Sequence, residues 1–148
     1  KEISLHYKSL YHKEMSEALS CLFCKLQHNN PNILYQNDSC YLILDIFPLA
    51  IQHMLLIPKK HAPYLHEYSS DELNDILPTI QHVVKTLGIK KYNLLQNNGH
   101  LQSIEHVHFH IIPCLEQGLN IQWNVIKTES DYVEKTVNEL KKRLSERK

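Results

Sequence analysis

The chain has 148 residues, and 43% of them are hydrophobic, which is enough for one buried core and short for two. Its 16 basic and 16 acidic residues give a formal charge of zero. Nucleic acid and anionic membranes are therefore not expected partners, and an anionic ligand would have to be held by local donors.

The expected compartment follows from hydropathy and cysteine content. No apolar run approaches the roughly 20 residues of a membrane span, and the polar N-terminal sequence lacks the apolar centre of a signal peptide. We therefore expect a cytoplasmic protein, with the nucleus as a second compartment. In a reducing compartment, the segment Cys21-Leu22-Phe23-Cys24 is interpreted either as half of a metal site or as two free thiols.

The first part of the chain predicts an extension followed by short strands. Residues 1–20 form either an irregular helix or a flexible extension. A short strand is expected from Ile33, and a longer strand over 40–46 is apolar on both faces except for Asp45. The pattern leaves two roles open for Asp45, a cap at the strand end or a contact to a ligand. A proline then breaks the chain, and 53–58 supplies the next strand.

The segment 69–88 predicts one long helix, because its apolar residues recur with the helical period. Ser69, with Glu72 three residues later, makes a capping box at the N-terminal end. Gly88 is the expected C-terminal stop. Pro78 lies inside the segment, so we expect a kink there.

The rest of the chain returns to strands and ends in a helix. Residues 92–96 predict a strand, 97–99 a turn, and the histidine-rich stretch 105–113 a further strand. After an irregular segment, 131–147 predicts a surface helix. Short strands joined by tight turns around one long helix predict an α+β fold with an antiparallel sheet.

The histidine-rich stretch carries the strongest functional signal. Side chains alternate between the faces of a strand, so His106, His108 and His110 would line one side about 7 Å apart, while the apolar residues between them enter the core. Imidazole acts as nucleophile, proton carrier or metal ligand near neutral pH. A row of metal ligands and a solvated histidine-rich face are the competing interpretations.

The segment from His106 to Ile112 resembles the His-x-His-x-His-apolar-apolar signature of the histidine triad (HIT) superfamily of nucleotide hydrolases and transferases. Three more blocks resemble the family in the same order along the chain: the strand pair from Leu44 to His61, the loop Asn97-Asn98-Gly99, and the pair Gln102-Ser103. The opening Cys21-Leu22-Phe23-Cys24-Lys25-Leu26 is similar to that of zinc-bearing members of the Hint-like branch.

The resemblance covers about residues 21–125, which we interpret as a HIT domain between an N-terminal extension, 1–20, and a C-terminal helical segment, 126–148. It implies an α+β fold with a five-stranded antiparallel sheet, one long helix and one C-terminal helix. Relatives of this kind are homodimers that join two such sheets into ten strands. A homodimer is therefore expected.

Family members that this chain resembles hydrolyse purine nucleoside phosphoramidates, acyl-adenylates or dinucleoside polyphosphates through a nucleotidyl-histidine intermediate. The resemblance makes His108 the nucleophile, and attack by a neutral imidazole splits one hard substitution at phosphorus into two easier ones. His110 and His53 would donate to the non-bridging phosphate oxygens. Ser103 would serve the leaving group.

The resemblance also implies how the nucleotide is held. Asn97, Gly99 and Gln102 would belong to the phosphate loop, and Asp45 would accept hydrogen bonds from both ribose hydroxyls. Five apolar residues would wall the base: Leu22, Phe23, Leu26, Ile43 and Ile46. The same five positions are equally consistent with an ordinary core.

The two-residue spacing of Cys21 and Cys24 lets one turn present both thiolates to one ion. In zinc-bearing relatives, the site is completed by the residues that correspond to His61 and His106. Four protein ligands fill a tetrahedral zinc site, so the implied zinc is structural rather than catalytic. No organic cofactor is expected, and a pair of reduced thiols without metal is the alternative.

One departure from the family lies between Gly99 and Gln102. Only His100 and Leu101 stand there, a shorter stretch than the usual loop, and Leu101 replaces a glycine. Such a loop has fewer ways to present backbone amides to phosphate. The substrate range is therefore open.

The leading hypothesis is a Hint-like nucleotide hydrolase or phosphoramidase that acts on AMP- or GMP-type substrates. The alternatives are a dinucleoside polyphosphate hydrolase, a nucleotide-binding interaction module with little turnover, and a metal protein that uses all three triad histidines.

Overall fold

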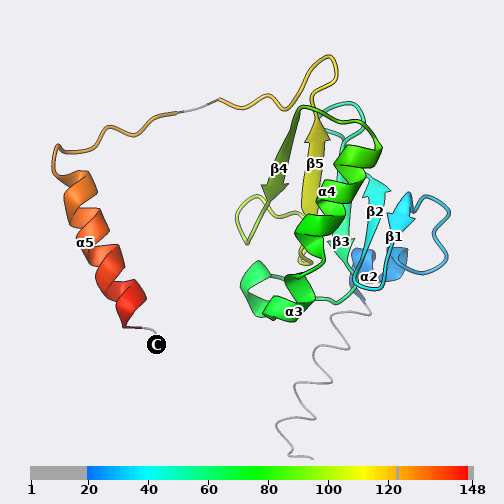
Figure 1. Cartoon of the computed structure of the whole chain (residues 1–148), viewed down its shortest axis with the longest axis horizontal. Coiled ribbons are helices and arrows are strands. Elements are labelled where there is room, and N and C mark those ends of the chain that lie inside the picture. The colour runs from blue at the N-terminus through cyan, green and yellow to red at the C-terminus, as the bar shows by residue number, and fades with distance from the viewer. Residues whose placement is uncertain (1–19, 123, 147–148) are drawn as a thin grey trace, which may run out of the picture.

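The computed structural model describes residues 20–122 and 124–146, so the expected N-terminal extension lies almost wholly outside the described residues. Its centre is a five-stranded sheet with the strand order β1-β2-β3-β5-β4, in which every pair of neighbours is antiparallel (Figure 1). The α+β class with an antiparallel five-stranded sheet is confirmed. The strands are β1 (Tyr35–Gln36), β2 (Cys40–Leu44), β3 (Met54–Pro58), β4 (Tyr92–Gln96) and β5 (Phe109–Pro113).

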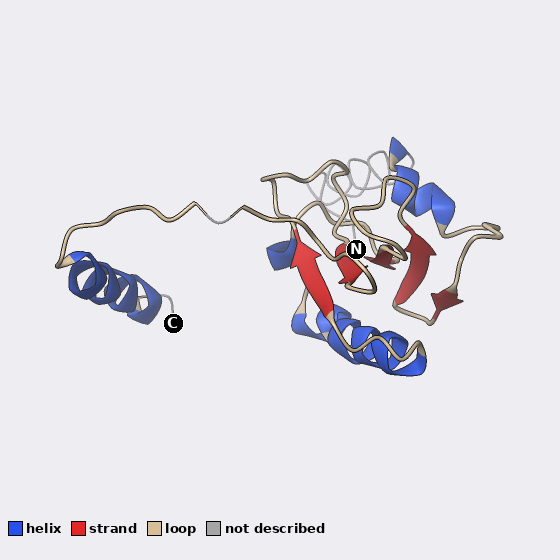
Figure 2. Ribbon diagram, turned by 90° about the horizontal axis from the view of Figure 1, so that it is seen from above, coloured by secondary structure: helices blue, strands red, loops and turns tan. Residues whose placement is uncertain are grey.

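Helices cover both faces of the sheet, and Figure 2 shows α4 and α2 on opposite sides of it. The described helical elements are α2 (Leu22–Leu26), the short 3-10 helix η1 (Leu65–Glu67), α3 (Ser70–Leu73), α4 (Ile76–Thr86) and α5 (Tyr132–Ser145). None of these helices has both the length and the apolar character needed to cross a lipid bilayer.

Alternation along the strands divides the apolar residues between two clusters. On the α4 side, strand residues pack against the helix; this cluster includes Leu42, Met54, Leu56, Val107, Phe109, Ile111, Ile76, Ile80, Val83 and Val84. On the α2 side, Phe23 packs against Tyr41, Ile43, Leu55 and Ile57. The register sets Leu55 opposite His110, so the α2 side is the face that carries this histidine.

The single helix predicted over 69–88 is wrong, because the segment forms α3 and α4 with a break between them. The capping box at Ser69 is confirmed: its hydroxyl accepts from the Glu72 N–H at 3.3 Å, and the Glu72 carboxylate accepts from the Ser69 N–H at 2.8 Å. Pro78 is the third residue of α4, where a missing N–H costs nothing, and its ring would clash with the carbonyl of Asn74 in a continuous helix. The helix therefore breaks at Asn74 instead of kinking at Pro78.

Three strands begin later than predicted, and one of them is β3, which starts at Met54 rather than His53. β1 starts at Tyr35 rather than Ile33, and β5 starts at Phe109, so His106 and His108 precede the strand. The backbone of residues 106–108, just before β5, is held in place by Val107, whose N–H donates to the Ala62 carbonyl at 2.9 Å. Side chains still alternate between the two faces of the sheet in this segment, since Val107 is fully buried in the α4-side core.

Candidate active site

A cavity of about 310 Å³ lies on the α2 side of the sheet. His108, His110, Asp45 and Ser103 line it. All five side chains expected to wall the base line it as well: Leu22, Phe23, Leu26, Ile43 and Ile46. Phe23 and Ile43 are also members of the core, whereas Leu22 and Ile46 are 50% and 81% exposed. The apolar wall of the cavity therefore contains both buried and exposed side chains.

The hydrogen bond of His108 fixes which ring nitrogen carries its proton. Nδ1 lies 2.7 Å from the backbone carbonyl of His106. A carbonyl can only accept, so Nδ1 donates and Nε2 keeps its lone pair. The side chain is 3% exposed, and burial lowers its pKa. His108 is thus a neutral imidazole, in the lining of the cavity, whose Nε2 is free to act as a nucleophile.

The proton on His110 is fixed through His53. The Leu49 N–H donates to His53 Nδ1 at 3.1 Å, so His53 carries its proton on Nε2 and donates to His110 Nδ1 at 3.0 Å. His110 must then be protonated on Nε2. That buried atom has no hydrogen-bond partner among the described residues. A buried N–H without a partner is costly, and His110 lines the cavity, so this donor is available to an anionic ligand there.

The structure does not support direct contact of His53 with a phosphate. The side chain is 1% exposed, and both ring nitrogens have protein partners. His53 lies outside the cavity lining and acts on His110 by orienting its ring. Burial also lowers the pKa of His53, which keeps the pair uncharged.

Asp45 directly follows β2 and also lines the cavity. Its Oδ1 accepts from the Phe47 N–H at 2.8 Å, a local bond that closes the turn after the strand. Its Oδ2 lies 3.5 Å from His53 Nδ1. The structure therefore shows the capping role that the sequence left open, and it places the same carboxylate in the cavity lining, where a ligand contact is geometrically available.

Three donors of the loop 97–102 make hydrogen bonds to the protein itself. Asn97 Nδ2 donates to the Leu101 carbonyl at 3.0 Å, and the Gly99 N–H donates to Gln102 Oε1 at 2.7 Å. The Gln102 amide nitrogen in turn donates to the Pro63 carbonyl at 2.8 Å. Asn97, Gly99 and Gln102 are not among the residues that line the cavity. In this conformation, the expected phosphate loop does not present these groups to the cavity.

Leu101, which stands where the family has a glycine, adopts a backbone conformation that favours glycine. Its φ is +56°, in the left-handed region that favours glycine, and the side chain is 78% exposed. A non-glycine residue there costs about 1–2 kcal/mol, with little packing to offset it. Leu101 thus holds a backbone conformation that glycine would adopt without this cost.

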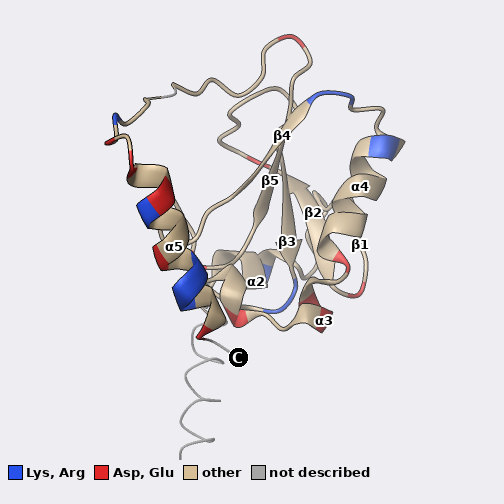
Figure 3. Ribbon diagram, turned by 60° about the vertical axis from the view of Figure 1, so that its left-hand side comes forward, with Lys and Arg blue, Asp and Glu red and all other residues tan. Residues whose placement is uncertain are grey.

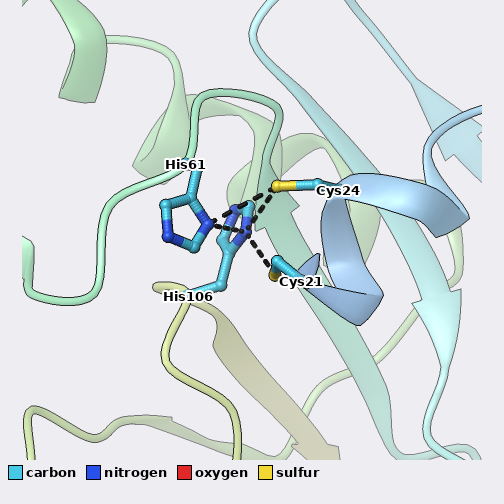
Figure 4. Close-up of side chains that lie close together, drawn as sticks. All are labelled: Cys21, Cys24, His61 and His106. Atoms are coloured by element: carbon cyan, nitrogen blue, oxygen red, sulfur yellow. Dashed lines mark hydrogen bonds between the residues drawn. The ribbon is translucent and has the colours of Figure 1, made fainter. Parts of the chain in front are cut away.

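A second cluster lies beside the cavity, where four side chains converge (Figure 4). Cys21 and Cys24 come from the start of α2, His61 follows β3, and His106 precedes β5. His106 Nδ1 lies 3.4 Å from Cys21 Sγ, 3.6 Å from Cys24 Sγ and 3.2 Å from His61 Nδ1. His61 Nδ1 lies 3.5 Å from Cys24 Sγ. These are the four residues that the family resemblance implied as zinc ligands, brought together from three segments of the chain.

These distances fit one tetrahedral zinc ion. Bond lengths of about 2.0–2.1 Å to nitrogen and about 2.3 Å to sulfur place tetrahedral ligands about 3.3 Å apart for two nitrogens and about 3.6 Å apart for nitrogen and sulfur. The His106 Nε2–H donates to the Pro58 carbonyl at 2.8 Å, so Nδ1 directs its lone pair at the cluster. Burial lowers the pKa of His106 to about 4, which keeps this ligand neutral.

The triad histidines do not share one metal site. Among the described residues, two groups could hold an ion; one contains His106 and the other contains His110, and neither contains His108. The interpretation in which all three rings bind one metal is therefore not supported. His106 belongs to the cysteine cluster, while His108 and His110 face the cavity.

The HIT domain family model matches residues 27–117. The chain belongs to the HIT family. Two curated relatives of this HIT protein are named adenosine 5'-monophosphoramidase. That of Candida albicans is 37% identical over 145 residues, covering 88% of this chain and 95% of the relative. That of Schizosaccharomyces pombe is 43% identical over 111 residues, covering 71% of this chain and 84% of the relative.

Solved structures resemble this HIT protein over most of its length. A histidine triad nucleotide-binding protein from Candida albicans has a TM-score of 0.76 at 37% identity, and the match covers 86% of this chain and 99% of that chain. A hypothetical protein from Leishmania major has a TM-score of 0.72 at 34% identity, covering 87% and 99%. The fold similarity extends beyond residues 27–117.

Some parts of the site were not predicted from the sequence. Phe47, Leu55 and Ile104 line the cavity, and Phe47 could have been found because it follows Asp45 by two residues at the end of the strand. A backbone carbonyl that fixes the tautomer of His108 is an expectation of the mechanism, but a backbone group has no sequence signature, so the sequence does not identify the backbone groups of Leu49, Pro58 and His106 that fix the histidine protons.

Proposed function

We propose that this HIT protein is a nucleotide phosphoramidase that releases a nucleoside monophosphate, AMP or GMP, through a nucleotidyl intermediate on His108. The observation that supports this most directly is the pairing of two nitrogens at one cavity. His108 offers a lone pair on Nε2, and His110 offers an N–H on Nε2 that has no hydrogen-bond partner among the described residues. A nucleophile beside a free donor suits attack on a phosphorus that carries an anionic oxygen.

The first step forms a bond between His108 Nε2 and the α-phosphorus while the P–N bond to the leaving amine breaks. A proton passes from the Ser103 hydroxyl to the departing nitrogen, and the water that attacks in the second step returns a proton to Ser103. The His108 ring becomes cationic, and the His106 carbonyl at Nδ1 stabilises that charge. The His110 Nε2–H donates to a non-bridging oxygen as its negative charge grows.

The second step restores the enzyme. Water attacks the phosphorus, the bond to His108 Nε2 breaks, and the nucleoside monophosphate leaves with the oxygen of that water. His53 takes no direct part, but it keeps His110 in the tautomer that donates, because its own Nε2–H occupies His110 Nδ1. It is a positioning residue in this proposal.

The nucleoside would lie against the α2 side of the cavity. The base would contact the five apolar wall residues, and Asp45 would accept from the ribose hydroxyls. The lining supports this, because Asp45 supplies a carboxylate to the same cavity as the wall residues. The predicted roles of Asn97, Gly99 and Gln102 would require the loop 97–102 to exchange internal hydrogen bonds for phosphate contacts.

We further propose that zinc fills the cluster of Cys21, Cys24, His61 and His106 as a structural ion. The fit of the donor distances supports this. A homodimer formed through the sheets, in the cytoplasm or nucleus, is proposed on the family resemblance.

A substrate panel tests the proposed reaction. Adenosine and guanosine 5'-phosphoramidates, the 2'-deoxyadenosine phosphoramidate and diadenosine polyphosphates would be compared by kcat/KM at one salt concentration. We expect the ribonucleoside phosphoramidates to be the best substrates and the deoxy compound to be about tenfold poorer, because Asp45 loses one partner. Faster cleavage of the polyphosphates would favour a dinucleoside polyphosphate hydrolase. Tight binding of AMP without turnover of any adenylate would favour an interaction module.

Acid should destabilise the protein through His110. Burial, together with His108 and His53, lowers the pKa of His110 to about 4. An unfolded chain takes up this proton near pH 6.5, so between about pH 6.5 and 4 the unfolded state binds more protons and stability falls as the pH falls. The unfolding free energy of the wild type should drop about 2–4 kcal/mol more over this window than that of His110→Gln. Urea unfolding at fixed pH values measures this, and parallel curves would contradict a neutral buried His110.

A further inference from the structure

Phe23 packs its ring directly against the proposed nucleophile. The ring centroid lies 5.2 Å from that of His108, with the two planes at 71°, and 5.9 Å from that of His106, with the planes at 79°. Aromatic rings at such distances and angles make the attractive edge-to-face contact. Phe23 is 4% exposed, so these contacts lie within the buried cluster on the α2 side of the sheet. One ring therefore contacts both histidines that precede β5.

The hydrogen bond of His108 does not by itself fix the plane of its ring. The bond from Nδ1 to the His106 carbonyl sets which nitrogen carries the proton, but a carbonyl accepts over a broad range of directions, so the ring can still turn about this bond. Such a turn would redirect Nε2, the atom that must point at phosphorus. Within the described residues, the ring contacts of His108 are with Phe23 and with His110, the latter at 4.9 Å. Phe23 is thus the contact that restrains the ring without being a member of the triad.

The neighbouring strands supply no charged side chain that could orient His108 instead. Strands β2, β3 and β5 contain no Asp, Glu, Lys or Arg, and Figure 3 shows them in tan. Asp45, which follows β2, accepts from the Phe47 N–H and lies beside His53. The orientation of His108 therefore depends on one neutral hydrogen bond and on packing. In a close-packed interior, the shape of one side chain constrains the position of the next.

Phe23 is itself held firmly enough to restrain a neighbour. The buried Tyr41 hydroxyl donates to the Phe23 carbonyl at 2.7 Å, which ties this turn of α2 to strand β2. Along the chain, Phe23 stands between Cys21 and Cys24, whose Sγ atoms lie 3.4 and 3.6 Å from His106 Nδ1. The backbone of α2 is therefore held against both β2 and the segment before β5, and the ring has a fixed base from which to contact His108.

We propose that Phe23 is a positioning residue, whose ring holds the imidazole of His108 in the orientation that aims Nε2 into the cavity. This inference rests on the proposed function, because it takes His108 as the nucleophile. Phe23 also lines the cavity as one of the five apolar wall residues. The proposal gives it a second role, in the chemical step rather than in binding of the base. Misplacement of a reacting group by about 1 Å can cost about 10²-fold in rate, so the ring contact has a measurable consequence.

One substitution made at two positions of the cavity tests this role. Phe23→Leu removes the ring that contacts His108, and Phe47→Leu is the matched variant, because Phe47 lines the same cavity but is 81% exposed. The single-turnover rate constant at saturating enzyme isolates the chemical step. We expect Phe23→Leu to lower it about 10- to 100-fold and Phe47→Leu to change KM while this rate constant stays within about threefold of the wild type. A change below about threefold in Phe23→Leu, or equal losses in both variants, would overturn the proposal.

Calorimetry checks that each variant is folded. If Phe23→Leu does not fold, Phe23→Met takes its place, since the flexible methionine side chain fills irregular space but has no ring.

Nuclear magnetic resonance of ¹⁵N-histidine-labelled protein tests the orientation without turnover. In the wild type, the Nδ1 proton of His108 is protected, because the side chain is 3% exposed and bonded to the His106 carbonyl. We expect this proton to exchange with water at least about tenfold faster in Phe23→Leu than in Phe47→Leu. Slower turnover with unchanged exchange would mean that Phe23 acts on the substrate alone, and would overturn the positioning role. A wild type that forms no adduct on His108 would instead overturn the proposed reaction, while the exchange rates would still decide whether Phe23 holds the ring.

Discussion

His108→Ala is expected to abolish release of AMP from an adenosine phosphoramidate. The substitution removes the nitrogen that is proposed to form the covalent intermediate, so the two-step path should be lost, and kcat should fall by about 10⁴ or more. His110→Gln should cost only about 10²–10³, because it removes one preorganised donor and leaves the nucleophile. The difference between the two variants distinguishes attack by His108 from stabilisation by His110.

Steady-state release of AMP and an acid quench for nucleotidyl protein measure these effects. His28→Ala is the control for loss of a histidine, since His28 is exposed and lies outside the cavity lining. The control should behave as the wild type. If His108→Ala retained more than about a tenth of the wild-type rate, or still formed the covalent adduct, His108 would lose its role as the nucleophile.

Disruption of the proposed zinc cluster is the change with the second largest expected effect. That effect is a loss of stability. Protein purified without added metal should contain about one zinc per chain, and Cys24→Ser should contain little. Structural zinc contributes about 10–16 kcal/mol of apparent binding free energy, which rivals the whole stability of a small domain. Tm should therefore fall by more than about 10 °C in Cys24→Ser.

Cys114→Ser is the matched control, because Cys114 is exposed and Cys24 is buried in the cluster. Zinc content by mass spectrometry and Tm by calorimetry decide the question together. A zinc ratio near zero in the wild type, with equal Tm values for both variants, would leave the pair of reduced thiols as the correct interpretation.

His106 connects the cluster of Cys21, Cys24 and His61 to His108. Its Nδ1 faces the cysteines, its Nε2–H donates to Pro58, and its carbonyl accepts from His108 Nδ1. Phe23 on α2 also makes edge contacts with the rings of both His106 and His108, at centroid distances of 5.9 and 5.2 Å. Displacement of His106 would therefore release the bond that fixes the proton of His108, and movement of α2 would open the cavity wall.

The sequence alone determined the features that depend on local spacing. Alternation placed the triad histidines on one side of the chain and Val107, Phe109 and Ile111 in the core, even though β5 begins only at Phe109. The capping box depended on two residues three apart in one turn, so Ser69 and Glu72 were sufficient to predict it. The cysteine spacing likewise predicted half of a four-ligand cluster.

Only the tertiary structure decided which groups meet and which nitrogens carry protons. The proton on His110 depends on the Leu49 N–H acting through His53, and the lone pair of His106 depends on the Pro58 carbonyl. These partners are backbone groups from segments far along the chain, and every residue type carries the same backbone. The hydrogen bonds of the loop 97–102 could not be predicted from the sequence for the same reason. Whether an amide donates to a ligand or to the protein itself depends on the folded geometry and not on the type of residue that carries the amide.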